Sequence, residues 1–99
     1  MKLENKVAIV TGGGKGIGAE ICLRLAKEGA KIVIAEMDIK NGEKISKKIQ
    51  DNNGEAIVVE TNVAEEDSVN NMVDVAIKKF GKIDICLLYT SDAADECDS

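Results

Sequence analysis

Residues 7–18 read VAIVTGGGKGIG, an apolar run that ends in glycines and continues into a helical pattern. The run 7–10 is typical of a strand buried on both faces of a parallel sheet. Glycines directly after a strand let the backbone turn tightly and approach a ligand without Cβ atoms in the way. The first N–H groups of the next helix lack intrahelical partners and lie at the positive end of its dipole. The stretch therefore predicts a strand, a turn and a helix start that bind a phosphate.

The same order of strand and helix is repeated along the chain. Strands are predicted at 6–10, 31–35, 56–59 and 82–85. The helical patterns between them end at Gly29, Gly54 and Gly81. Glycine is favoured just after a helix because it adopts the left-handed conformation that ends one. The repeat therefore predicts three strand–helix units and the start of a fourth.

Strands rich in Val and Ile that alternate with helices form right-handed crossovers and a parallel sheet. We therefore predict an α/β fold, a truncated, Rossmann-like doubly wound sheet in three α/β/α layers. One local signal disagrees with this pattern. Asn41-Gly42 could form a hairpin turn, but its flanks do not alternate apolar and polar residues, so a helix is favoured there.

Composition excludes several classes of function. The chain has 99 residues, enough for one domain, and no histidine, so it has no Ser-His-Asp triad. Three cysteines without a C-x-x-C pair do not predict a metal site, and Cys22 is expected to be a buried apolar residue. We expect no nucleic-acid partner, because no basic stripe is present. With no signal peptide and no apolar run near the ~20 residues of a membrane span, we expect a cytoplasmic protein.

Glu36 is the second part of the predicted site. It lies at the carboxyl end of the second strand, where a carboxylate can accept hydrogen bonds from both hydroxyls of an adenosine ribose. Its charge also repels a 2′-phosphate. Lys15 in the glycine loop favours NADP instead, because its ammonium group could pair with that phosphate. Since Glu36 would face the ribose directly, we predict NAD as the cofactor, with NADP as the alternative.

The glycine loop is compatible with more than one class of protein. A P-loop NTPase is excluded, because Lys15 is followed by Gly16 rather than by Ser or Thr. An S-adenosylmethionine-dependent methyltransferase stays open, since Gly12-x-Gly14-x-Gly16 with an acid after the second strand would suit that cofactor as well. A tight turn without a ligand and a non-catalytic nucleotide-binding module are the remaining alternatives.

The motif Thr11-Gly12-x-x-x-Gly16-Ile17-Gly18 resembles the cofactor motif of the short-chain dehydrogenase/reductase family. Four further segments agree in order, at 3–10, 34–36, 61–63 and 80–85. The resemblance covers 3–85 and favours a dehydrogenase over a methyltransferase. It implies a cofactor-binding site formed by Gly12, Gly14, Lys15, Gly16, Ile17, Gly18, Glu36, Asn62 and Val63.

Asn62 departs from the aspartate that this family usually has at the matching position. That aspartate accepts a hydrogen bond from the adenine amino group, and the amide oxygen of Asn62 can still accept one. The backbone N–H of Val63 would meet the adenine ring. The structural alternative for Asn62 is a helix cap or an Asx turn.

The resemblance implies a secondary alcohol dehydrogenase or ketoreductase that transfers a hydride to or from a nicotinamide. It also implies a homo-oligomeric parent, through helices that this chain lacks. The family's catalytic Ser and Tyr-x-x-x-Lys pair are not found, because Tyr89 is followed at the fourth position by Ala93. Neither Tyr89 nor Ser91 is assigned a role. We expect the 99-residue chain to hold the adenosine and pyrophosphate half of the cofactor without turnover.

The end of the chain differs from the rest in charge and in resemblance. Residues 86–99 carry Asp92, Asp95, Glu96 and Asp98 and no basic residue. The run 87–95 resembles one translated frame of a sequencing-adapter DNA. We therefore divide the chain into a cofactor-binding part, 1–85, and a non-native tail, 86–99, with a genuine acidic tail as the alternative.

Overall fold

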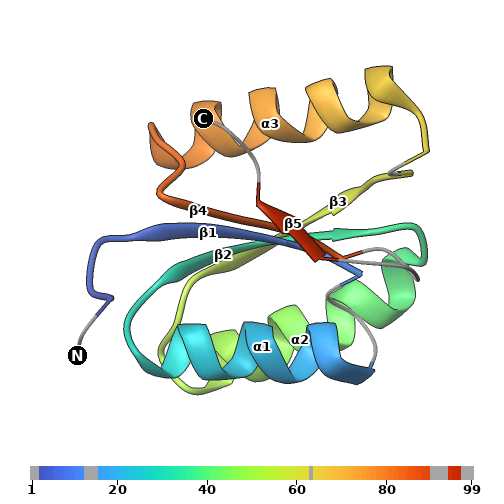
Figure 1. Ribbon diagram of the computed structural model, residues 1–99. Coiled ribbons are helices and arrows are strands. Elements are labelled where there is room, and N and C mark those ends of the chain that lie inside the picture. Colours follow the sequence, from blue (N-terminus) through green and yellow to red (C-terminus); the bar gives the residue numbers. More distant parts are fainter. Residues whose placement is uncertain (1–2, 13–15, 63, 90–93, 97–99) are drawn as a thin grey trace.

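The computed structural model describes residues 3–12, 16–62, 64–89 and 94–96, in which strands and helices alternate (Figure 1). The strands of these residues are β1 Val7–Thr11, β2 Lys31–Glu36, β3 Ala56–Glu60, β4 Ile85–Tyr89 and β5 Ala94–Glu96. Their helices are α1 Gly16–Lys27, α2 Ile39–Asp51 and α3 Glu66–Phe80.

The strands form one sheet in the order β3-β2-β1-β4-β5. The first four strands of the chain run parallel, and the short β5 pairs antiparallel with β4. α1 and α2 cover one face of the sheet and α3 covers the other (Figure 1). The predicted α/β fold, Rossmann-like and in three layers, is confirmed. The hairpin alternative at Asn41-Gly42 is wrong, because both residues lie inside α2.

Two apolar cores hold the layers together, because neighbouring side chains of a strand point to opposite faces of the sheet. Ala8, Val10, Ile32 and Ile34 belong to the core on the face of α1 and α2. Val7, Ile9, Val33 and Met72 belong to the core on the face of α3. Full burial of one Val or Ile side chain contributes about 1.5–3 kcal/mol to stability. The two central strands, apolar on both faces, therefore dominate the packing.

Cys22 on α1 is completely buried in the first of these cores, as the helical pattern predicted. Burial raises the pKa of its thiol to about 12, and the negative charge of Glu36 adds to the shift. The thiol is therefore un-ionised at neutral pH and serves as an apolar residue.

Asp38 caps the start of α2. It precedes the helix, and its Oδ1 accepts hydrogen bonds from the backbone N–H groups of Lys40 at 3.0 Å and Asn41 at 3.4 Å.

The Asn-Gly pair inside α2 has a packing reason. A Cβ atom added to Gly42 would lie 2.6 Å from Cγ1 of Val58. The glycine therefore lets α2 approach β3 closely, which explains why a sequence typical of a turn occurs in a helix.

The helix ends follow the glycine pattern in two cases of three. Gly29 and Gly81 adopt the expected left-handed conformation, with φ of 98° and 85°. After α2, Asn53 takes that conformation instead, with φ of 68°, and Gly54 packs against Ile49. In the described ranges, no helix combines the length and the apolar character needed to cross a membrane.

β4 begins three residues later than predicted, at Ile85. Oδ2 of Asp84 accepts a hydrogen bond from the backbone N–H of Val7 at 2.9 Å, and the N–H of Asp84 donates to the Val7 carbonyl at the same distance. Lys82 lies 3.1 Å from this carboxylate. The Val7 N–H and then Lys82 hold the pKa of Asp84 below its usual value. The two hydrogen bonds between Asp84 and Val7 join the start of β1 to the residue before β4, so regular strand pairing begins only at Ile85.

Candidate cofactor site

The predicted site residues that the structure describes lie at the carboxyl edge of the sheet, where β1, β2 and β3 end side by side. Thr11 pairs in register with Ala35, and Glu36 pairs with Glu60. The N–H of Gly12 donates to the Ala35 carbonyl at 2.7 Å, just beyond the last pair of β1. The N–H of Thr61 donates to the Glu36 carbonyl at 3.1 Å. The glycine turn, Glu36 and the Thr61–Asn62 segment are therefore neighbours on one edge.

Gly12 and Gly16 need glycine for their backbone conformation. Their φ angles are 66° and 53°, a region that other residues rarely adopt. A Cβ added at either position would meet no atom of the described residues within 4 Å. No described residue therefore blocks a ligand from approaching the backbone of Gly12 and Gly16. A backbone approach of this kind suits the phosphates of a dinucleotide.

Helix α1 starts at this glycine turn. It begins at Gly16, so its first N–H groups, those of Gly16, Ile17 and Gly18, face the same edge without intrahelical acceptors. Gly18 is buried, whereas the side chain of Ile17 is 59% exposed. Gly14 and Lys15, two further predicted site residues, lie outside the described residues, as does Val63.

Glu36 ends β2 with a partly buried side chain. Its Oε1 accepts a long hydrogen bond of 3.4 Å from the N–H of Asp38. Its charge raises the pKa of the Cys22 thiol, which places the carboxylate near α1. A carboxylate between the glycine turn and the start of α2 can accept hydrogen bonds from vicinal hydroxyls of a sugar.

Asn62 takes the structural role that the sequence left open beside adenine binding. Its Oδ1 accepts a hydrogen bond from the N–H of Ala64 at 3.0 Å, which is an Asx turn. Its Nδ2 donates to Oε1 of Glu65 at 3.1 Å, and its N–H donates to Oγ of Ser68 at 2.8 Å. The amide oxygen can still accept a second hydrogen bond. Adenine binding by Asn62 therefore stays a prediction, now with a side chain already held in place.

Three residues at this edge were not predicted from the sequence. Met37 follows Glu36 directly and is 63% exposed, a large apolar side chain beside the site. Asp38 is the cap of α2, and its position just before a helical pattern could have revealed it. Glu60 becomes a neighbour of Glu36 only through strand pairing. Its place could be found only once the register of β2 and β3 was known.

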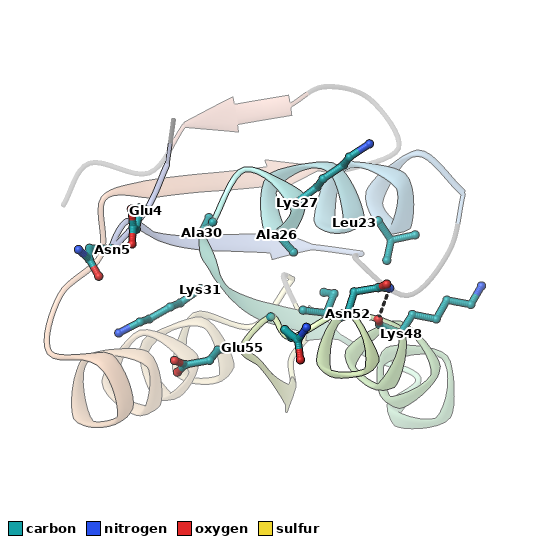
Figure 2. A pocket seen from close by; sticks show the side chains of 14 residues that line it. Glu4, Asn5, Leu23, Ala26, Lys27, Ala30, Lys31, Lys48, Asn52 and Glu55 are labelled. Carbon is teal, nitrogen blue, oxygen red and sulfur yellow. Dashed lines mark hydrogen bonds between the residues drawn. The ribbon is translucent and has the colours of Figure 1, made fainter. Parts of the chain in front are cut away.

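A separate hollow of about 910 Å³ lies at the opposite, amino edge of the sheet (Figure 2). Leu23 and Ala26 of α1 border it on one side, and Lys48 and Asn52 of α2 on the other. Its remaining lining residues are Glu4, Asn5, Lys27, Gly29, Ala30, Lys31, Ile49, Asn53, Gly54 and Glu55. Of the predicted site residues that the structure describes, none borders this hollow. Within the part of the chain that the structure describes, no group of three or more His, Cys, Asp or Glu side chains could hold a metal ion.

Comparison with known proteins identifies the family of this chain. The sequence profile of the short chain dehydrogenase family matches residues 6–90, and the chain therefore belongs to this family. An uncharacterised oxidoreductase of Listeria monocytogenes is 41% identical over 88 residues, which are 89% of this chain and 36% of that protein. An uncharacterised oxidoreductase of Thermotoga maritima is 43% identical over 83 residues, 84% of this chain and 32% of that protein.

Solved structures give the same assignment. The crystal structure of an NAD⁺-bound xylitol dehydrogenase superposes with a TM-score of 0.83 at 36% identity, over 87% of this chain and 33% of that one. The chain spans about a third of the length of these relatives. Family membership favours the interpretation that this chain is part of an NAD(P)-dependent short-chain oxidoreductase. It disfavours the methyltransferase alternative.

Proposed function

We propose that this chain binds the adenosine and pyrophosphate half of NAD at the carboxyl edge of its sheet. The observation that carries the proposal is the positive φ of Gly12 and Gly16, where an added Cβ would meet no described atom within 4 Å, beside Glu36 on the adjacent strand end. The NAD⁺-bound relative with the same fold supports it. In the parent protein, a bound nicotinamide would supply hydride chemistry, and this chain would orient the cofactor.

Each predicted site residue has one role in this proposal. The segment from Gly12 through Gly14, Lys15, Gly16 and Ile17 to Gly18 receives the pyrophosphate with backbone N–H groups. Glu36 accepts hydrogen bonds from the ribose hydroxyls, and Asn62 and Val63 hold the adenine. These N–H donors complement a phosphate, and the carboxylate of Glu36 complements a diol.

The preference for NAD over NADP is part of the proposal. Glu36 would repel a 2′-phosphate, while Lys15 would attract it. Titration of the chain with each dinucleotide by isothermal calorimetry tests the preference. Tighter binding of NAD is expected, and tighter binding of NADP would contradict the assignment.

For the parent protein we propose hydride transfer between the nicotinamide and a secondary alcohol or ketone. A cytoplasmic location and a homo-oligomeric state also stay predictions for that protein. The 99-residue chain is expected to bind NAD without turning over an alcohol. An assay of NAD reduction with a panel of secondary alcohols checks this expectation, and turnover by the chain alone would contradict it.

We also propose that residues 1–85 are the cofactor-binding part and that residues 86–99 are foreign to the natural protein. The resemblance of 87–95 to adapter DNA and the uncompensated acidic residues support a boundary there. β4 and the family profile both extend past this boundary, to Tyr89 and to residue 90. An apolar run after Ile85 would pair with the open edge of β1 whatever its origin. Amplification across residue 86 from source DNA tests the boundary, and recovery of the same tail from the natural locus would refute it.

A further inference from the structure

Glu60 is an acidic residue at the carboxyl edge that the roles above do not use. It is the last residue of β3, it is exposed, and it pairs in register with Glu36 of β2. Partners in register on neighbouring parallel strands lie about 4.8 Å apart at their backbones and point to the same face of the sheet. Glu60 and Glu36 therefore stand side by side.

The face on which both carboxylates lie can be identified from the residues two positions earlier in each strand. A Cβ added to Gly42 of α2 would contact both Val58 and Ile34. These two side chains therefore lie beneath α2, and Ile34 belongs to the core on that face. Because side chains alternate along a strand, Glu60 and Glu36 point to the same face, one step closer to the carboxyl edge.

Asp38, the third acidic residue at this position, is already engaged. Its carboxylate accepts hydrogen bonds from two N–H groups at the start of α2 and from the side-chain amide of Asn41 at 3.2 Å. These donors and the helix dipole offset its charge. In the described part of the chain, no such donor reaches the carboxylate of Glu60. Like charges side by side on neighbouring strands weaken a sheet, so the fold gives no reason for this pair.

We propose that Glu60 is a further specificity-determining residue, which disfavours a 2′-phosphate on the ribose that Glu36 binds. The inference rests on the proposed function, because it needs adenosine at this edge. If a 2′-phosphate is taken to lie about 8 Å from the Glu60 carboxylate, repulsion between the two corresponds to roughly a fivefold loss of affinity at low ionic strength. Screening at physiological ionic strength reduces the effect to about twofold. NAD has no charge at this position, so its affinity is affected much less.

The test compares Glu60→Gln, Glu60→Asp and Glu55→Gln with the wild-type chain. Glu55 precedes the same strand at the opposite edge, so Glu55→Gln is a matched control for the loss of one negative charge. Dissociation constants for NAD and NADP are measured by calorimetry at about 10 and 150 mM salt. Circular dichroism melts confirm that each variant is folded.

We expect Glu60→Gln to tighten NADP binding about fivefold at the lower salt concentration and about twofold at the higher one, with NAD changed by less than twofold. Glu60→Asp, which keeps the charge, and Glu55→Gln should both bind like the wild type. Equal changes for the two dinucleotides, or an NADP gain that salt does not reduce, would overturn the role of Glu60 alone. Failure of the wild-type chain to bind NAD, or full NAD affinity in Glu36→Ala, would instead overturn the proposed function and with it this inference.

Discussion

At the carboxyl edge of the sheet, a Cβ on Gly12 or Gly16 would meet no described atom within 4 Å, whereas at the amino edge Asp84 and Gly54 are in contact with their neighbours. The Asp84 carboxylate bonds the backbone of Val7, and a Cβ on Gly54 would lie 2.7 Å from a methyl group of Ile49. Asp84 and Gly54 therefore help to hold the fold at the amino edge. The carboxyl edge brings the first N–H groups of α1 and the partly buried carboxylate of Glu36 together, and a ligand site requires polar groups that converge in this way.

The largest expected effect comes from Gly12→Ala, with Gly81→Ala as its matched control. Both glycines have positive φ and open space around the missing Cβ, so alanine should cost each about 1–2 kcal/mol of folding free energy. Only Gly12 lies at the proposed pyrophosphate site. We expect Gly12→Ala to weaken NAD binding about 100-fold, or roughly 2.7 kcal/mol, in calorimetry. An equal loss of affinity in Gly81→Ala would remove the distinction between the two edges.

The second effect concerns charge at the carboxyl edge. Glu36→Ala removes the proposed ribose acceptor, and loss of hydrogen bonds to a charged group should weaken NAD binding about 10- to 100-fold. Glu55→Ala, at the amino edge, should leave the affinity unchanged. Calorimetric titration of both variants with NAD provides the measurement. If Glu36→Ala keeps full affinity, the ribose does not bind at this residue.

The third prediction concerns the amino edge, where a substitution should change stability but not NAD binding. Gly54→Ala would place its Cβ 2.7 Å from Cγ2 of Ile49 and 3.0 Å from the Ile49 carbonyl oxygen. Such overpacking should lower the free energy of unfolding by about 1–3 kcal/mol. The affinity of the folded chain for NAD should not change. Urea unfolding measures the free energy of unfolding. If Gly54→Ala unfolds at the same urea concentration as the wild type, the overpacking prediction is wrong.

The smallest expected effect is the pH dependence from Asp84. Its pKa is lowered in the folded chain, chiefly by the Val7 N–H and then by Lys82. The stabilisation is therefore present above the ordinary carboxyl pKa of 3.8 and is lost as the pH falls through the lowered value. We expect Asp84→Asn to melt at a lower temperature than wild type at pH 6 and to approach it below pH 3. A constant difference between the two melting curves across that range would contradict the role of the carboxylate.

The order of elements could be predicted because it depends on local patterns. β1 is apolar from Val7 to Val10 and glycines end α1 and α3, so strand and helix positions follow from the residues themselves. The start of β4 could not be predicted in this way. It depends on hydrogen bonds between Asp84 and Val7, which are 77 positions apart in the sequence. The packing role of Gly42 likewise depends on Val58 of a different element.

For the candidate site too, the residues in local motifs could be predicted from the sequence, whereas the contacts between distant elements could not. Gly12, Gly16 and Glu36 follow from the motif, and the parallel sheet brings them to one edge, as expected. The Asx turn of Asn62 was foreseen as an alternative, but its bonds to Glu65 and Ser68 follow from where α3 begins. Glu60 was missed because only the pairing of β3 with β2 places it beside Glu36.

The most direct test of a cofactor site at the carboxyl edge is a titration of the isotopically labelled chain with NAD, followed by amide NMR shifts. We predict that the largest shifts occur at Gly12, Gly16–Gly18 and Glu36. Residues around the amino-edge hollow, such as Gly54 and Glu55, should shift little. Shifts confined to that hollow, or no saturable shifts at millimolar NAD, would contradict a site at the carboxyl edge.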